Sequence, residues 1–272
     1  KLLAFTDSVQ DASHRAGFFS SRTYNFTFRT ALQHVINKAA QQGVPLTDVG
    51  HRMLGHWSQP RPDGLGSVKE AIASLLPPDL HEYPDWKEFR DNPAAQEPPK
   101  RLREDIEKRI TWEATSEFGL MQTHGRTMEA SGSSCLTWDE ARITSTIEKL
   151  RERLPGLDPG LASLSDEDFQ LWIYGWLHRY RLRGALYHPY LDTYAAAGYW
   201  GKYPWGRAIP GRETYPPQGR YKCRLMVTER DRFHDHVQAA TAGGSQRPWH
   251  VEWTRRSLGT RNVDETGLLD LI

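Results

Sequence analysis

The sequence has few cysteines and no long apolar run. Its 272 residues include only two cysteines, Cys135 and Cys223, which stand far apart and offer neither a disulfide framework nor the paired spacing of a metal site. No stretch approaches the roughly 20 apolar residues of a membrane span, and LLAF at residues 2–5 is too short for the apolar region of a signal peptide. We therefore expect a soluble cytoplasmic protein, or a piece of one, that does not contact a membrane.

Several motifs that would identify an enzyme are also missing. The sequence has no GxxxxGK[ST] loop for a nucleotide's phosphates, no GxSxG nucleophile elbow and no HExxH zinc motif. His234 and His236 flank Asp235 and could ligate a metal, but no third ligand stands at a suitable spacing. The formal net charge of +1 does not indicate a class of partner. We therefore expect no catalytic residue, cofactor or metal in this chain.

The spacing of apolar residues predicts a mainly α fold with long irregular connections. Residues 2–5 form a short apolar run typical of a buried strand, and Ser8 with Asp11 resembles the capping box that begins a helix. Helices are predicted over residues 9–19, 27–42, 101–117, 137–154 and 165–180. Prolines recur through residues 45–99, so long strands are not expected in that range. Period-2 alternation is largely limited to residues 221–227.

Some of these helices have recognisable starts and apolar faces. Thr137 with Glu140, and Ser165 with Asp168, match the capping box, in which a hydroxyl and a carboxylate three residues later bond each other's backbone N–H. The side chains expected to point inward are Phe28, Leu32, Val35, Ile36 and Ala39 in residues 27–42, and Leu102, Ile106 and Ile110 in residues 101–117.

Residues 172–212 combine aromatic and basic side chains. Eleven aromatic residues lie between residues 172 and 205. Residues 172–212 contain six basic residues and a single acidic one. Arginine and lysine neutralise phosphates while exposed rings stack on unpaired bases, so this composition is typical of single-strand binding. The candidate nucleic-acid contacts are Arg179, Arg181, Arg183, Tyr199, Trp200, Lys202 and Arg207. Trp172, Trp176 and Tyr180 recur every four residues, which favours a place in the core over an exposed platform.

Four segments carry a resemblance that covers most of the chain. They are AFTDSVQDASHRAGFF at residues 4–19, EFGLMQTHGRTMEASGSS at 117–134, LHRYRLRGALYHPYLDTY at 177–194 and PWHVEWTRRSLG at 248–259. In this order they resemble segments of large bacterial superfamily 2 helicases of the DEAD/DEAH-box type. The first is similar to the strand, loop and helix that open the second, RecA-like motor lobe of those helicases, and only this segment touches a recognised helicase motif.

The resemblance implies contacts to the nucleic-acid backbone just after the first strand. Thr6, Ser8, Gln10 and Arg15 would occupy that region, where hydroxyls, exposed amides at a helix start and a guanidinium can bind phosphate. Asp7 repels phosphate, so its implied role is to cap the helix or orient a neighbour.

The resemblance also implies a division of the chain. Residues 1–42 would be a strand–helix–helix fragment of the second motor lobe, and residues 43–272 a mostly helical accessory insertion. The phosphate-binding loop, the DEAD/DEAH box and a convincing arginine-finger motif are absent from the sequence. ATP and magnesium are therefore implied for the parent helicase, and we expect this segment alone to be inactive.

Three functions remain open at this point. The first is a segment of an ATP-dependent helicase that contacts a nucleic-acid strand, with DNA favoured over RNA and with the rest of the helicase chain as a second partner. The second is a protein-interaction or scaffold module of a defence or repair complex, with the aromatic residues buried. The third is a carbohydrate-binding domain, since aromatic rings also stack on sugars.

Overall fold

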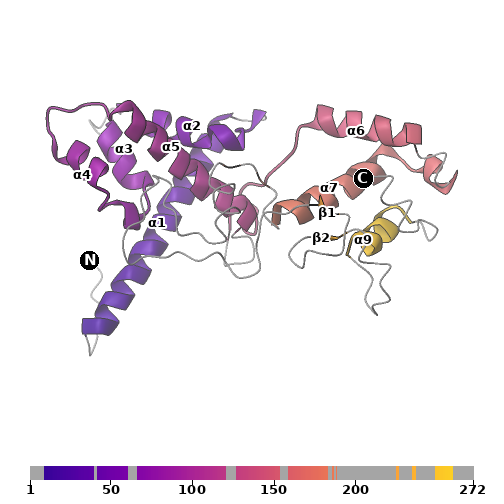
Figure 1. Ribbon diagram of the computed structural model, residues 1–272, viewed down its shortest axis with the longest axis horizontal. Helices are drawn as coiled ribbons and strands as arrows, with labels where there is room; N and C mark the ends of the chain where they lie inside the picture. Colours follow the sequence, from indigo (N-terminus) through magenta and orange to yellow (C-terminus); the bar gives the residue numbers. More distant parts are fainter. Residues whose placement is uncertain are drawn as a thin grey trace. The chain divides into compact units, whose positions relative to one another are not determined.

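The computed structural model describes residues 9–39, 42–60, 66–120, 127–153, 159–182, 186, 188, 225–226, 235–236 and 249–259. This described part is mainly helical, as the sequence predicts (Figure 1). The strand predicted at residues 2–5 lies outside the described residues. Among the residues that are described, no helix is both long enough and apolar enough to cross a membrane.

The chain divides into two compact units. The first comprises residues 1–118, 124–134 and 202–211, and the second comprises residues 119–123, 135–201 and 212–272. The first contains α1 (Val9–Ala39), α2 (Val49–Trp57), α3 (Val68–Leu75), α4 (Pro84–Asp91) and α5 (Lys100–Thr115), with 3-10 turns at Leu46–Asp48 and Pro78–Leu80. The second contains α6 (Glu140–Arg153), a 3-10 turn at Pro159–Ser163, α7 (Asp166–Leu182), α9 (Trp249–Ser257), and β1 (Leu225–Met226) paired in parallel with β2 (Asp235–His236).

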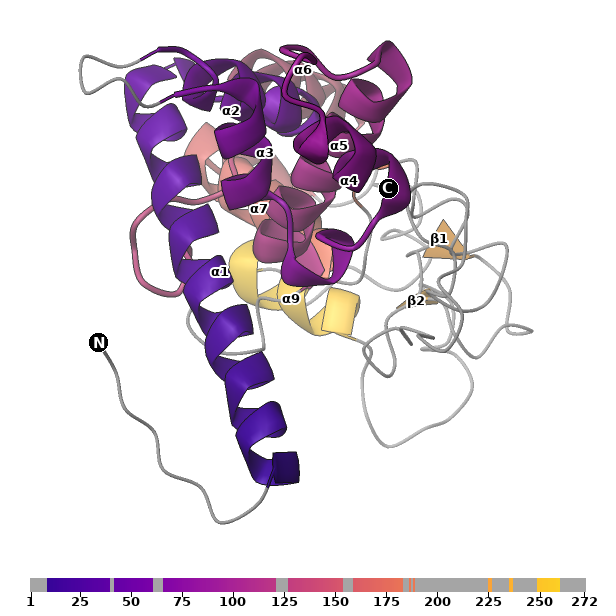
Figure 2. The same ribbon diagram turned by 90° about the vertical axis from the view of Figure 1, so that its left-hand side faces the viewer.

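In the first unit, α1 is a single helix where the sequence predicts two. The segment SSRTYNF at residues 20–26 contains neither proline nor glycine, so nothing in it ends a helix. The long helix lies beside α2 and α3 (Figures 1 and 2). Its predicted apolar face is confirmed at Phe28, Leu32 and Val35, which are all buried. Residues on both sides of the predicted boundary at residue 42 therefore share one core.

The sequence analysis did not predict α2, α3 and α4. The prolines of residues 45–99 indicated irregular structure, but helix start signals lie between them. Ser67 begins α3 with a capping box, in which its hydroxyl accepts the Glu70 N–H at 3.2 Å and the Glu70 carboxylate accepts the Ser67 N–H at 3.1 Å. Pro84 stands in the first turn of α4, where its missing N–H is not needed. Proline here begins a helix rather than interrupting one.

The prediction for α5 is confirmed. Leu102, Ile106 and Ile110 are buried, and α5 packs against α2. The backbone N–H of Gly50 in α2 donates to Thr111 Oγ1 at 3.0 Å, and a Cβ at Gly50 would overlap the Glu107 carbonyl. Glycine at position 50 therefore permits the close approach of these two helices.

Glu117 joins three parts of the first unit. It lies in the π-helical turn Ser116–Leu120 that follows α5. Arg29 in α1 donates to both of its carboxylate oxygens, at 2.9 and 3.0 Å, and the Met128 backbone N–H donates to one of them at 2.7 Å. The Glu117 side chain is only 9% exposed, so loss of Arg29 would leave a poorly solvated negative charge.

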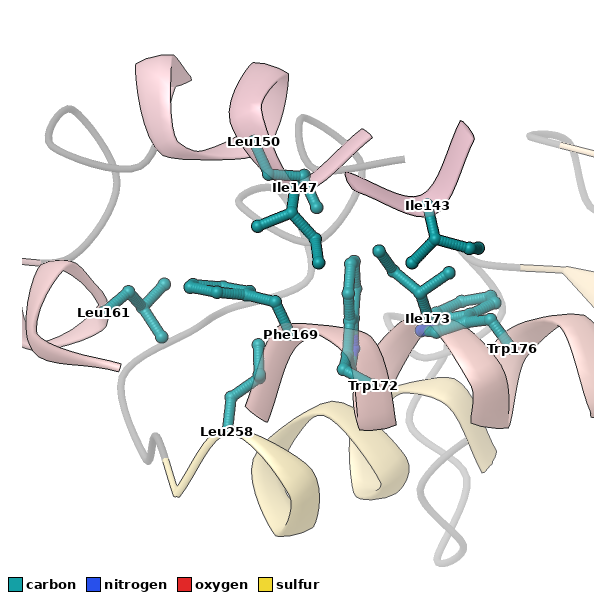
Figure 3. Close-up of a cluster of buried hydrophobic side chains, with 9 residues drawn as sticks. All are labelled: Ile143, Ile147, Leu150, Leu161, Phe169, Trp172, Ile173, Trp176 and Leu258. Carbon is teal, nitrogen blue, oxygen red and sulfur yellow. The ribbon is translucent and has the colours of Figure 1, made fainter. Parts of the chain in front are cut away.

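The second unit is built around tryptophans. Figure 3 shows its buried cluster, which consists of Ile143, Ile147, Leu150, Leu161, Phe169, Trp172, Ile173, Trp176 and Leu258. The interpretation of Trp172 and Trp176 as core residues is confirmed, and Tyr180 packs against the cluster. Two hydrogen bonds hold α9 against α7. The Trp253 indole N–H donates to the Trp172 carbonyl at 3.0 Å, and the Trp172 indole N–H donates to Thr254 Oγ1 at 2.9 Å.

The predicted start of α7 is confirmed, but that of α6 is wrong. The Ser165 hydroxyl accepts the Asp168 N–H at 3.2 Å, while the Asp168 carboxylate accepts from the Ser165 hydroxyl at 2.8 Å and from its N–H at 3.0 Å. These hydrogen bonds lower the pKa of Asp168 from its usual 3.8. The bond from the Ser165 hydroxyl has the larger effect, and the bond from the Ser165 N–H adds to it. At α6, Asp139 rather than Thr137 accepts the first free N–H groups, from Ala141 at 2.9 Å and Arg142 at 3.3 Å.

A paired glycine substitution tests how α9 packs on α7. A Cβ at Gly175 would overlap ring atoms of Trp253, whereas a Cβ at Gly55 in α2 would meet no atom within 4 Å. We expect Gly175→Ala to lower the free energy of unfolding by about 1–3 kcal/mol through overpacking. Gly55→Ala should raise it by about 0.4–1 kcal/mol, since alanine favours a helix. Urea unfolding followed by circular dichroism measures both, and a Gly175→Ala protein as stable as the parent would contradict this packing.

Candidate nucleic-acid interface

The eleven predicted nucleic-acid contacts are described to very different extents. Arg179 and Arg181 have described side chains, and for Gln10 and Arg15 only the position in α1 is described. The predictions at Thr6, Ser8, Arg183, Tyr199, Trp200, Lys202 and Arg207 lie outside the described residues. The structure therefore tests the electrostatic environment of two arginines in α7.

Arg179 is half-buried and contacts α9. The carbon of its guanidinium lies 5.1 Å from the centroid of the Trp249 ring, within the range of a cation–π interaction. Trp249 in turn packs edge-on against Trp176, with 6.0 Å between ring centroids. Arg179 thus helps to attach α9 to α7 and still carries a positive charge at that junction.

Arg181 is buried, which corrects the expectation of a surface contact. Its residue exposure is 1%. Its Nη2 lies 2.6 Å from His178 Nδ1, and because a guanidinium can only donate, Nδ1 accepts and the ring proton is on Nε2. Because Arg179 and Arg181 alternate along the sequence, they are expected to point to different sides of a helix, but the spacing alone does not say which side is buried. The helix turns one guanidinium toward the Trp249 ring and the other into the interior.

The described aromatic residues of α7 form packing contacts rather than an exposed platform. Trp172 and Trp176 are buried, and their rings contact each other with centroids 6.1 Å apart. Tyr174 stacks on Trp138 at 5.7 Å, and the Gln170 side-chain amide donates to its hydroxyl at 3.0 Å. In this part of the chain, contacts to a nucleic-acid strand would therefore come from cations rather than from rings.

Two arginines that the sequence analysis did not select lie in the last turn of α9. Arg256 is exposed, and Arg255 is half-buried with an Nε atom that has no hydrogen-bond partner among the described residues. Neither arginine forms an ion pair with a carboxylate in the described part of the chain. The sequence signal for them is the adjacent Arg-Arg pair in the segment PWHVEWTRRSLG, which was interpreted only as a tryptophan-containing helix.

This pair of arginines is suited to bind phosphate. Guanidinium groups match phosphate oxygens with two parallel N–H donors. Trp253 and Thr254 fix the opposite side of α9 to the core, so the arginines extend from a rigid element. Within the described residues, no group of three histidine, cysteine or acidic side chains could hold a metal ion.

A comparison of two arginine substitutions tests the burial of Arg181. Arg181→Ala and Arg256→Ala remove the same charge, but only Arg181 is buried. We expect Arg181→Ala to lower the free energy of unfolding by about 1–3 kcal/mol, and Arg256→Ala to change it by less than about 0.5 kcal/mol. Thermal and urea unfolding measure the difference. Equal stability of the two variants would show that Arg181 faces solvent.

Comparison of the chain with protein-family models, with curated proteins and with solved structures gives no match.

Proposed function

We propose that the chain is a segment of an ATP-dependent nucleic-acid helicase of the DEAD/DEAH-box type and that it contacts the strand rather than hydrolysing ATP. The observation that carries this proposal is the adjacent pair Arg255 and Arg256, held on α9 with no carboxylate paired to either among the described residues. The pair falls within one of the four segments that resemble such helicases. Arg179 of α7 supports the proposal, because it contacts α9 at Trp249 and adds a third cation.

The physical basis of the proposal is phosphate neutralisation. Each arginine that contacts a phosphate releases condensed counterions, which favours binding and makes it salt-dependent. A guanidinium on an anchored helix loses less conformational freedom on binding than one on a loop, because its backbone is already fixed. Such contacts position a strand without reading its sequence, as a helicase needs.

The remaining elements of this proposal concern the parent protein. Residues 1–42 would be a fragment of a RecA-like lobe whose two predicted helices are the single helix α1, and residues 43–272 would be its helical insertion. ATP and magnesium would bind elsewhere in the parent, which would act in the cytoplasm on DNA in preference to RNA. Continuous helix from Val9 onward is consistent with a helix that follows a lobe strand, although Thr6 and Ser8 lie outside the described residues.

A protein-interaction or scaffold module remains the second candidate, and one observation favours it. Trp172 and Trp176 are buried in the core of the second unit, so their rings are not accessible for stacking on bases. Large apolar side chains are nevertheless exposed, with Phe26 68% and Leu171 55% accessible. Such residues are common at protein interfaces.

Charge removal on α9 tests the strand-contact proposal. Fluorescence anisotropy with a labelled single-stranded DNA should show binding that weakens steeply as salt rises. We expect the double variant Arg255→Ala/Arg256→Ala to bind more weakly. The negative slope of log affinity against log salt should become less steep by about 1.4, or about 0.7 for each lost phosphate contact.

The matched control removes two adjacent exposed cations from another helix. Lys100→Ala/Arg101→Ala at the start of α5 changes the net charge by the same amount, in the other unit. Its affinity should change much less than that of the α9 variant. Equal losses in both variants would indicate general charge attraction, and a folded parent chain that binds no strand at low salt would refute the proposal. Arg256→Glu, at an exposed position, repeats the test without disturbing the half-buried Arg255.

A further inference from the structure

The first unit contains an apolar cavity that the proposed function does not use. Its volume is about 430 Å³, and it lies among α1, α2 and α3. Its apolar walls include Phe26, Trp57 and Leu75, one from each of these helices. Cavities of this size accept small organic molecules or single groups of larger ones.

The two aromatic residues of the cavity are placed differently. Phe26 is 68% exposed, which is unusual for a phenylalanine. Trp57 is half-buried, and its indole N–H donates to the Ala31 carbonyl at 3.4 Å, so that its ring is attached to α1. The cavity therefore offers an accessible ring beside a fixed one.

One carboxylate at the cavity, that of Glu70, is held by backbone N–H groups. Glu70 Oε2 accepts the Gly66 N–H at 2.8 Å and the Ser67 N–H at 3.1 Å, which holds the carboxylate in place as part of the α3 capping box. Glu70 Oε1 accepts no hydrogen bond among the described residues. A ligand that lies in the cavity can thus donate an N–H to a rigid oxygen at its edge.

Cations lie along α1 on both sides of the cavity. Arg22 is exposed one turn before Phe26, and Lys38 is exposed near the end of the helix, close to His34 and His56. Arg22 and Lys38 are about 24 Å apart along the helix axis at 1.5 Å per residue, and about 160° apart around it at 3.6 residues per turn. An anionic backbone that contacts both therefore winds part of the way around α1 as it passes the cavity.

We propose that this cavity binds one unpaired nucleobase of a single strand whose phosphates follow α1. The proposal rests on the proposed function, because it assumes that the chain binds nucleic acid. A base combines flat apolar faces with donors confined to its edge, which matches ring walls and a single carboxylate oxygen. Cytosine donates from its N4 amino group, whereas thymine places carbonyl oxygens on both sides of its one N–H, so the cavity favours cytosine over thymine.

The experiment compares strands with and without bases. Three oligonucleotides of about 12 units, within the site size of single-strand-binding folds, carry only cytosines, only thymines or only abasic sites, and each is titrated against the full chain. We expect the cytosine strand to bind roughly 5- to 150-fold more tightly than the abasic strand, as one stacked base contributes. Phe26→Ala should remove most of this difference, and Thr30→Trp, which fills the cavity from an exposed position, should do the same.

Leu171→Ala is the matched control. It removes a large exposed apolar side chain on α7 in the second unit, the only one besides Phe26 among the described residues, and should leave the preference for bases unchanged. Equal binding of cytosine and abasic strands by the parent chain would overturn the base cavity and leave the phosphate contacts of α9 standing. Failure of every strand to bind would overturn both proposals. A preference for bases that survives Phe26→Ala and Thr30→Trp, or a dimer of the free chain that Phe26→Ala dissociates, would also overturn the cavity proposal.

Discussion

The contact between Trp253 and Gly175 is the constraint on which the second unit depends. The indole ring occupies the space that a side chain at position 175 would need, and its N–H donates to the Trp172 carbonyl. Trp172 returns a hydrogen bond to Thr254, so α9 is fixed to α7 at two points. Because this face of α9 is occupied, its other residues, among them Arg256, are presented to solvent. The aromatic residues of α7 therefore hold in place the helix that carries Arg255 and Arg256.

Glu117 has a comparable role in the first unit. It accepts hydrogen bonds from Arg29 of α1 and from the backbone of Met128, and so ties α1 to the end of α5. One wall of the apolar cavity belongs to this same helix α1. Glu117 and Trp253 both fall in the segments on which we base the proposal of a helicase, and both are structural residues. The resemblance therefore includes residues that maintain the fold, beside the arginines that we propose contact the strand.

Local spacing predicted which side chains share a helix face, but not what covers that face. The every-fourth pattern of Trp172 and Trp176 and the capping pair Ser165 and Asp168 act within one helix, and both were recognised. Arg181 and Arg256 look alike in sequence, yet one is buried and the other exposed, because burial depends on elements far along the chain. The cavity draws on three helices, so no single stretch of sequence indicates it.

The most direct test of this account is hydrogen–deuterium exchange of the full chain with and without a saturating single-stranded cytosine oligonucleotide. We predict slower exchange on binding in the last turn of α9 and in residues 22–38 of α1, with α4 unchanged. If the strand is bound and exchange in α9 stays the same, Arg255 and Arg256 do not contact it, and the central claim is contradicted.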